Sequence, residues 1–291
     1  MSVIHSRPID LSTYRTIAHP EEYDVDWAGF YRRADAATEL LRRSVGHELG
    51  VMYGDHPYQI LDIYRPSGSS NGVALVFFHG GAFREGHPGH YGYLARPFVA
   101  RGSFYVSAGY RLLPEVEVAN CLEDAQQAIG WLYLNRERWG LHRVVVSGHS
   151  AGARIVAALA LTRGWRSRYG VPDEFVAGGI AISGGYGMFH EVAAHRHGSV
   201  SRPGDEPFTN IECTPPLIVA YGPAERNRAG EPAGAYADSS EALIDVLRSR
   251  GAPVTDVPLP GLDHPDTADA LAAKGSPLHA AALELMKEGS S

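Results

Sequence analysis

The sequence of 291 residues has only two cysteines, Cys121 and Cys213, and no long hydrophobic run. Two cysteines cannot form the disulfide framework of a small secreted domain, and residues Met1–Pro8 lack the apolar core of a secretory signal. Uninterrupted aliphatic and aromatic stretches, such as Val73–Phe78, are far shorter than the roughly 18 residues that a membrane-spanning helix needs. We therefore expect a cytoplasmic protein without a membrane segment.

Positive charge is also scarce in this chain. Lys and Arg total 26 against 33 for Asp and Glu, which gives a formal net charge of −7. Because nucleic-acid binding requires a basic surface that neutralises phosphates, nucleic acid is not expected as a partner. Hydrophobic residues make up 44% of the chain and charged residues 20%, which is typical of a globular protein. If the chain assembles, we expect a homodimer.

Short apolar runs alternate with longer segments of helical periodicity along most of the chain. The runs are rich in β-branched and aromatic side chains, as buried strands are. Such an alternation predicts an α/β fold, in which crossover helices lie on both faces of a mostly parallel sheet. The predicted strands are Gln59–Tyr64, Ala74–Phe78, Phe104–Ala108, Val144–Ser147, Gly178–Ser183, Leu217–Tyr221 and Thr255–Leu259. The predicted helices are Tyr91–Arg101, Ala119–Trp139, Gly152–Arg163, Ser239–Arg250 and Ser276–Lys287.

Two segments fall outside this alternation. Residues 1–50 contain a helix-like stretch from Trp27 to Leu41, whose apolar side chains need a surface to cover. We expect this segment to pack over a core domain of residues 51–291. Residues 186–213 are rich in Gly, His, Ser and Pro and lie between two predicted strands, where α/β enzymes often carry a loop or lid insertion.

The pattern G-x-S-x-G lies between a predicted strand and a predicted helix. It occupies Gly148–Gly152, with the sequence Gly-His-Ser-Ala-Gly. This arrangement is typical of a nucleophile elbow, in which the two glycines permit a turn too tight for a Cβ. The turn would push the hydroxyl of Ser150 clear of the sheet, so Ser150 is the candidate nucleophile. The alternative is a glycine-rich turn with an N-capping serine.

A second glycine-rich loop, His79–Phe83, directly follows the predicted strand Ala74–Phe78. Acyl transfer needs backbone N–H groups that point at a developing oxyanion, and paired glycines permit this loop shape. An ordinary turn between a strand and a helix is the alternative, although it explains one glycine better than two. We expect an oxyanion hole formed by the backbone of Gly80, Gly81, Ala82 and Ala151.

The last two predicted strands each end in a loop with a residue that can complete a catalytic triad. Glu225 follows the sixth predicted strand and His264 follows the seventh. In this architecture the acid and then the histidine follow the serine in the chain, and ligands bind where the strands end. We predict that His264 is the general base and that Glu225 orients it. Glu231 and Asp238 are the rival acids.

Together these motifs resemble those of the α/β-hydrolase superfamily, specifically its esterase and kynurenine formamidase-like branch near the relatives of hormone-sensitive lipase. The resemblance runs from about Val51 to the C-terminus. It is carried by the segments Tyr53–Asp55, Leu61–Pro66, His79–Phe83, Tyr110–Glu115, Gly148–Gly152 and Leu259–His264. It implies Ser150 as nucleophile, His264 as base and the acidic residue three after Gly222, here Glu225, as the third member. Many relatives carry aspartate at that acid position, and residues 186–213 differ from the family's usual stretch.

The sequence therefore predicts a serine hydrolase of small esters or activated amides that needs no metal or other cofactor. Two activities fit, namely an aryl formamidase acting on a small N-formyl aromatic amine and a carboxylesterase acting on short acyl esters. Aromatic side chains available for a pocket favour an aromatic substrate. We predict Phe83, His149 and Tyr186 as substrate-binding residues.

Two other classes of protein stay open. A metal-dependent hydrolase is suggested by a cluster of His190, Glu191, His195 and His197. The first and second histidines are five residues apart, however, whereas a zinc-binding pair on a helix needs a spacing of four to share one face. A non-catalytic binding protein on a hydrolase scaffold usually lacks a triad member, and this chain has a suitable residue at each of the three positions.

Overall fold

The computed structural model describes residues 26–187, 211–225 and 234–287. Within these residues one eight-stranded sheet has the order β1-β2-β4-β3-β5-β6-β7-β8. The strands are β1 (His47–Met52), β2 (Ile60–Tyr64), β3 (Val73–Phe78), β4 (Phe104–Ala108), β5 (Arg143–His149), β6 (Val176–Ile182), β7 (Leu217–Tyr221) and β8 (Val254–Pro258). β1 and β2 pair antiparallel, as do β2 and β4, and the other neighbours pair parallel. The predicted α/β class with a mostly parallel sheet is confirmed.

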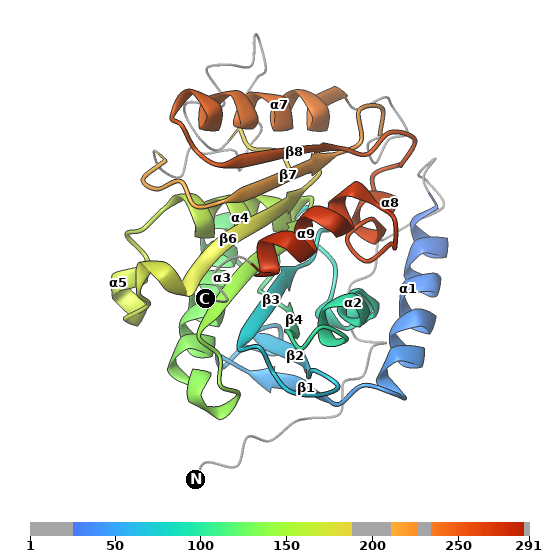
Figure 1. The fold of residues 1–291 in the computed structure, drawn as a ribbon, viewed down its shortest axis with the longest axis vertical. Helices are drawn as coiled ribbons and strands as arrows, with labels where there is room; N and C mark the ends of the chain where they lie inside the picture. The colour runs from blue at the N-terminus through green and yellow to red at the C-terminus, as the bar shows by residue number, and fades with distance from the viewer. Residues whose placement is uncertain (1–25, 188–210, 226–233, 288–291) are drawn as a thin grey trace.

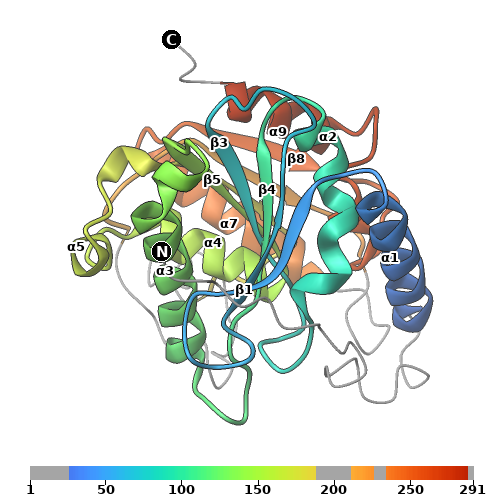
Figure 2. The ribbon, with the colours of Figure 1, turned by 90° about the horizontal axis from the view of Figure 1, so that it is seen from below.

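Helices cover both faces of this sheet, as Figures 1 and 2 show. The α-helices are α1 (Trp27–Arg42), α2 (Arg96–Val99), α3 (Val118–Leu134), α4 (Ala151–Leu161), α5 (Arg166–Tyr169), α7 (Gly234–Ser249), α8 (Asp266–Asp269) and α9 (Pro277–Lys287). Short 3₁₀ helices are η3 (Pro88–Ala95), η4 (Arg136–Arg138) and η5 (Asp173–Phe175). Apolar residues of α3, α4 and α7 pack in one core cluster, and those of α1, η3 and α9 pack in the other.

Strand β3 shows how the sheet separates these two clusters. All six of its residues are buried. Ala74 and Val76 lie in the cluster of α3 and α4, whereas Val73 and Leu75 lie in the cluster of α1 and α9. Successive side chains of a strand point to opposite faces, so a strand covered on both faces is apolar at most positions. This explains why the predicted strands appear as continuous apolar runs.

Strand β1 has no counterpart among the predicted strands. It lies at the edge of the sheet, and most of its side chains are only half-buried. Its register with β2 shifts between Glu48 and Val51, where Gly50 adopts a positive φ of 63°. An irregularity of this kind interrupts the alternation of apolar and polar side chains. Without that alternation, the sequence of β1 does not have the pattern of a strand.

Helix α1 lies along the outside of the molecule beside η3 (Figures 1 and 2). The imidazole Nδ1 of His90 in η3 lies 2.5 Å from Asp35 Oδ1 in α1. The backbone N–H of Tyr93 donates to Thr38 Oγ1 at 3.0 Å. These polar contacts, together with the apolar side of α1, attach the helix to the sheet domain.

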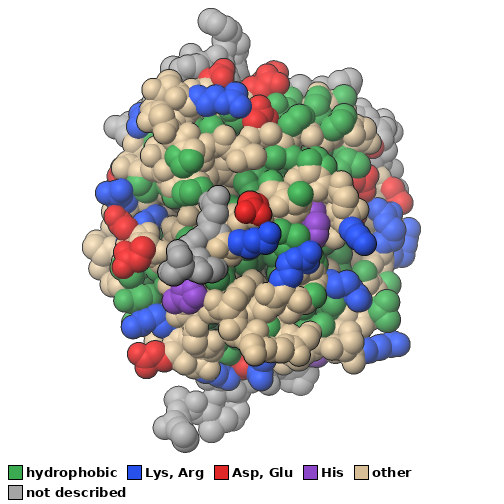
Figure 3. All heavy atoms as spheres, viewed as in Figure 1, with side chains coloured by type: hydrophobic (Ala, Val, Ile, Leu, Met, Phe, Trp, Pro, Cys, Tyr) green, Lys and Arg blue, Asp and Glu red, His purple; other side chains and the backbone are tan. Residues whose placement is uncertain are grey.

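The charges of the sequence are mixed on the surface. The face drawn in Figure 3 carries both basic and acidic side chains, with hydrophobic side chains between them. Among the residues that the structure describes, none of the helices has the length and apolar character needed to cross a membrane.

Candidate active site

Ser150 lies in the tight turn between β5 and α4. Its backbone has φ 54° and ψ −113°, a left-handed conformation that is unfavourable for a residue with a Cβ. The N–H of Ser150 donates to Ile182 O of the neighbouring strand β6 at 2.8 Å, which holds the turn in this conformation. Strained residues of this kind concentrate at functional sites. The side chain is partly exposed, as a nucleophile must be.

The glycines on either side of the serine are required by space. A Cβ on Gly148 would lie 2.5 Å from the carbonyl carbon and oxygen of Gly152, and a Cβ on Gly152 would lie 2.0 Å from Phe78 O. Both distances are far shorter than van der Waals contact. The geometry therefore matches the steric reason for which the sequence predicts an elbow here.

His264 and Glu225 form a buried pair where β8 and β7 end. His264 Nδ1 lies 2.8 Å from Glu225 Oε2, and their exposed fractions are 3% and 0%. The second oxygen, Glu225 Oε1, accepts a hydrogen bond from the backbone N–H of Gly222 at 3.3 Å. Because the carboxylate oxygen accepts, the neutral imidazole carries its proton on Nδ1. The structure thus brings together the predicted base and the predicted acid.

Burial changes the proton affinity of this acid. It raises the pKa of Glu225 from 4.5 to about 7, against the opposing effects of His149 and of hydrogen bonds from Ser183 and from the backbone of Gly222. A carboxyl group away from water is harder to ionise, because its charge loses hydration.

The structure describes only one of the two rival acids, Asp238 and Glu231. Asp238 is exposed on α7. Glu231 lies outside the described residues, as do His190, Glu191, His195 and His197. In the part of the chain that the structure describes, no group of three or more His, Cys, Asp or Glu side chains is placed to hold a metal ion.

Aromatic rings surround the His264 imidazole. Tyr236 stacks on it with a centroid distance of 4.2 Å and an interplanar angle of 15°. Trp27 of α1 approaches edge-on at 6.0 Å. Tyr236 is not among the predicted site residues, because the predicted helix begins only at Ser239 and a lone aromatic carries no signal. Its position beside the histidine arises only when α7 packs against the loop after β8.

The glycine-rich loop His79–Phe83 lies beside Ser150. A Cβ on Gly80 would lie 3.1 Å from Ser150 Cβ, so the backbone of the loop directly approaches the serine. Gly81, Ala82 and Phe83 all have positive φ, at 113°, 52° and 61°. The N–H groups of the next two residues both donate to Gly81 O, which closes the turn.

This placement meets the first requirement of an oxyanion hole. The donors assigned to Gly80, Gly81, Ala82 and Ala151 stay a prediction.

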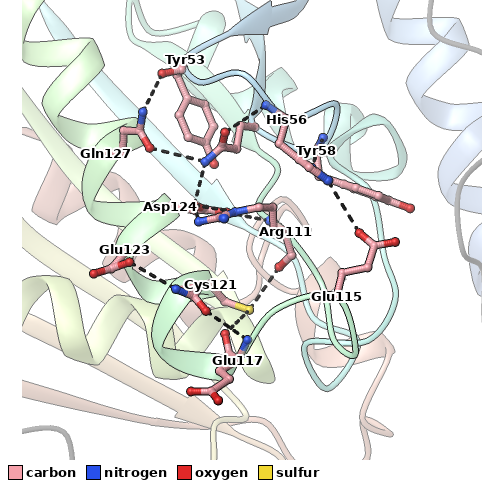
Figure 4. A network of polar contacts seen from close by, with 12 residues as sticks. Tyr53, His56, Tyr58, Arg111, Glu115, Glu117, Cys121, Glu123, Asp124 and Gln127 are labelled. Carbon is pink, nitrogen blue, oxygen red and sulfur yellow. Dashed lines mark hydrogen bonds and ion pairs between the residues drawn. The ribbon is translucent and has the colours of Figure 1, made fainter.

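The motif Tyr110–Glu115 supports that loop at both ends. Tyr110 Oη donates to His79 O at 2.7 Å, and the N–H of Leu113 donates to Phe83 O at 2.8 Å. Between these contacts, Arg111 Nε and Nη2 donate to the two carboxylate oxygens of Asp124 at 2.8 and 2.6 Å (Figure 4). Asp124 is buried on α3, so the pair fixes the motif to that helix.

The predicted substrate-binding side chains are all buried. The exposed fractions are 2% for Phe83, 1% for His149 and 0% for Tyr186. Phe83 packs edge-on against Tyr110, with the Arg154 guanidinium 5.3 Å from its ring centroid. The Tyr186 backbone N–H donates to Ser239 Oγ at 2.7 Å. At these exposures the three side chains lie in the interior of the protein, and their contact with a substrate stays a prediction.

A strained serine elbow on a mostly parallel sheet, with a paired histidine and carboxylate at the same edge, defines an α/β hydrolase. The chain belongs to this family, since the family model described as "alpha/beta hydrolase fold" matches residues 75–233. The resemblance inferred from the sequence motifs is confirmed.

Particular relatives place the chain near esterases and formamidases. It is 31% identical to Esterase LipC of Mycobacterium tuberculosis over an alignment of 163 residues, and this alignment covers 54% of this chain and 40% of that protein. It is 30% identical to Kynurenine formamidase of Danio rerio over an alignment of 154 residues, and this alignment covers 53% of this chain and 51% of the relative. The matches thus span about half the length of these relatives or less.

Solved structures show the same fold. The crystal structure of Esterase B from Lactobacillus rhamnosis aligns with a TM-score of 0.66 and 19% identity, covering 90% of each chain. At this identity the likeness is one of fold.

Proposed function

We propose that this protein is a serine hydrolase of small esters or activated amides, in which Ser150, His264 and Glu225 form the catalytic triad. The observation that carries the proposal is the 2.8 Å contact between His264 Nδ1 and Glu225 Oε2. The imidazole of this pair lies against His149, the residue directly before the strained Ser150. Sequence similarity to an esterase and to a formamidase supports the same class of reaction.

The triad would act in two stages. Ser150 Oγ attacks the carbonyl carbon of the substrate while His264 Nε2 takes the hydroxyl proton, and Glu225 stabilises the imidazolium that forms. Backbone N–H groups of the His79–Phe83 loop and of Ala151 stabilise the oxyanion. His264 then returns the proton to the leaving alcohol or amine, and a water molecule cleaves the acyl-enzyme by the same steps.

We propose two substrate classes for this triad, namely short acyl esters and small N-formyl aromatic amines. A relative named as an esterase supports the first, and relatives named as kynurenine formamidases support the second. The aromatic rings of Trp27 and Tyr236 beside His264 favour a planar aromatic group on the substrate. The proposal requires no metal or other cofactor, and it assigns the enzyme to the cytoplasm.

A substrate panel tests the proposal. Purified protein is assayed with p-nitrophenyl acetate and butyrate, N-formylkynurenine and an N-acetyl aryl amide, with and without EDTA. We expect turnover of an ester or the formamide that EDTA leaves unchanged, and much slower cleavage of the unactivated amide. Turnover that disappears with EDTA and returns with added zinc would contradict the serine mechanism, and so would no turnover of any of these substrates.

A further inference from the structure

The side chain of His149 lies where three segments of the candidate site meet. It directly precedes Ser150 in the elbow, and a Cβ on Gly80 of the glycine-rich loop would lie 3.0 Å from its Nδ1. Its Nε2 lies 2.8 Å from the backbone carbonyl oxygen of His264, and the two imidazole centroids are 4.6 Å apart. One buried ring therefore contacts the segments that hold the nucleophile, the oxyanion donors and the base.

The proton of this ring can be placed from its partners. A carbonyl oxygen only accepts hydrogen bonds, so Nε2 of His149 carries the proton and donates. Burial, together with the neighbouring His264, lowers the pKa of His149 to about 3. The ring is therefore neutral at the pH at which such an enzyme works. His149 Nδ1 has no hydrogen-bond partner among the described residues, so the ring has a single polar contact in this part of the chain.

The carbonyl of His264 has a second donor. Thr267 Oγ1 donates to the same oxygen at 2.8 Å. Removing the donor of His149 would therefore leave this buried oxygen with a partner. Loss of the His149 donor would therefore lower stability only slightly, because no buried acceptor is left unsatisfied. It would, however, release one side of the loop that carries the imidazole of His264.

We propose that His149 is a positioning residue that anchors the backbone of His264 and so sets the distance of the imidazole from Ser150. This inference rests on the proposed triad. It replaces direct substrate binding as the role of His149, since the side chain is 1% exposed and its donor faces the protein. Proton transfer depends steeply on distance, and a misplacement of about 1 Å can cost roughly 100-fold in rate.

Two substitutions separate this role from simple packing. His149→Leu keeps an apolar body and removes the donor. His149→Gln places an amide nitrogen near the position of Nε2 and keeps a donor for the carbonyl. We expect His149→Leu to lower kcat by about 10-fold to 100-fold with KM within about twofold of wild type. We expect His149→Gln to recover most of that loss.

The matched control is His279, on α9. It is buried at 8% exposure, and its Nδ1 lies 3.0 Å from the carbonyl oxygen of Leu271. His279→Leu removes the same kind of bond away from the triad. We expect it to lower Tm while kcat of the folded enzyme stays within about twofold of wild type.

The measurements are kcat, KM, Tm and the rate at which a fluorophosphonate labels Ser150. A kcat of His149→Leu equal to that of His279→Leu would overturn the inference, and so would His149→Gln as slow as His149→Leu. If the leucine variant does not fold, His149→Asn replaces it, because its shorter side chain does not reach the carbonyl. Equal kcat for the Gln and Asn variants would then overturn the inference. Wild-type protein without Ser150-dependent hydrolysis would instead overturn the proposed function itself.

Discussion

Among the residues of the candidate site, Glu225 has a pKa that burial raises well above its ordinary value. In the proposed triad its carboxylate has to be charged to stabilise the imidazolium of His264, yet loss of hydration raises its pKa to about 7. The hydrogen bonds that it receives from His264 and from the backbone of Gly222 favour the charged form and oppose this effect. In the proposed triad, the acid would therefore work close to the pH at which it takes up a proton.

A pH dependence of the rate follows from this balance. The pKa of Glu225 is about 7, so at lower pH its carboxylate takes up a proton and becomes neutral. A proton on His264 Nε2 would also remove the base. We expect kcat/KM on a p-nitrophenyl ester to be highest above pH 8 and to fall as the pH decreases through about 7. The measurement is a rate profile from pH 5 to 9, with folding followed by circular dichroism. A flat profile across that range would show that neither group is needed.

Removing the charge of the acid tests its assignment. Glu225→Gln keeps the shape and hydrogen-bonding capacity of the side chain but cannot stabilise the imidazolium. We expect kcat to fall by about 10²-fold to 10⁴-fold, since loss of a triad acid elsewhere costs about 10⁴-fold.

The rival acids serve as its controls. Asp238→Asn changes an exposed side chain on α7, and Glu231→Gln changes the other rival. Both should keep nearly full kcat on the same ester at the same pH. If either control is the damaging change and Glu225→Gln is not, the acid is assigned wrongly.

At the scale of elements, the glycine-rich loop depends on a neighbour far along the chain. The motif that begins at Tyr110 bonds to His79 O and Phe83 O, and the pair of Arg111 with Asp124 fixes the motif to α3. The loop that is proposed to hold the oxyanion thus takes its shape from contacts outside itself.

Tyr110→Phe tests this support. The substitution removes the hydroxyl that donates to His79 O but keeps the ring, which stacks on His79 at 4.4 Å. We expect about 1 to 3 kcal/mol lower stability, because a buried carbonyl loses its partner. We also expect kcat to fall by about 10-fold, because the loop loses one end of its support.

Tyr105→Phe is the matched control for this change. The hydroxyl of Tyr105 is also buried and donates to the backbone oxygen of Tyr91 at 2.9 Å, away from the loop. It should lower stability by a similar amount and leave kcat unchanged. Equal kcat values for the two variants, measured at a temperature where both are folded, would show that Tyr110 only contributes to stability.

Most elements of the sheet could be predicted from the sequence because their physics is local. Strands buried on both faces are mostly apolar, and glycines in a tight turn leave a pattern with fixed spacing. The predicted helix Tyr91–Arg101 is instead a 3₁₀ segment followed by the short α2, which has Pro97 in its first turn. Proline removes a backbone donor, so one continuous helix through this position is disfavoured.

Contacts between distant residues could not be predicted in the same way. The pair of His264 and Glu225 could be predicted because both residues follow strands that end at the same edge of the sheet. The bond from His149 to the carbonyl of His264 spans 115 residues and depends on the packing of two loops. The stacking of Tyr236 on the imidazole likewise depends on where α7 begins. No pattern of spacing or composition encodes such contacts.

For the molecule as a whole, we propose that the elbow between β5 and α4 makes Ser150 the nucleophile of a hydrolase. A sheet of eight strands within the described residues brings three loops to one edge. These loops carry the serine, the acid and the histidine. If this arrangement is an active site, one hydroxyl should be far more reactive than any other in the protein.

The most direct measurement combines labelling with one substitution. A fluorophosphonate probe is added to wild-type protein and to Ser150→Ala, the labelled residue is identified by peptide mass spectrometry, and hydrolysis of p-nitrophenyl acetate is measured on the same samples. We expect the probe to label Ser150 alone, the alanine variant to take up no label, and the kcat of that variant to be at least about 10⁴-fold lower with an unchanged Tm. Labelling at another residue, or a folded alanine variant that keeps its turnover, would show that Ser150 is not the nucleophile.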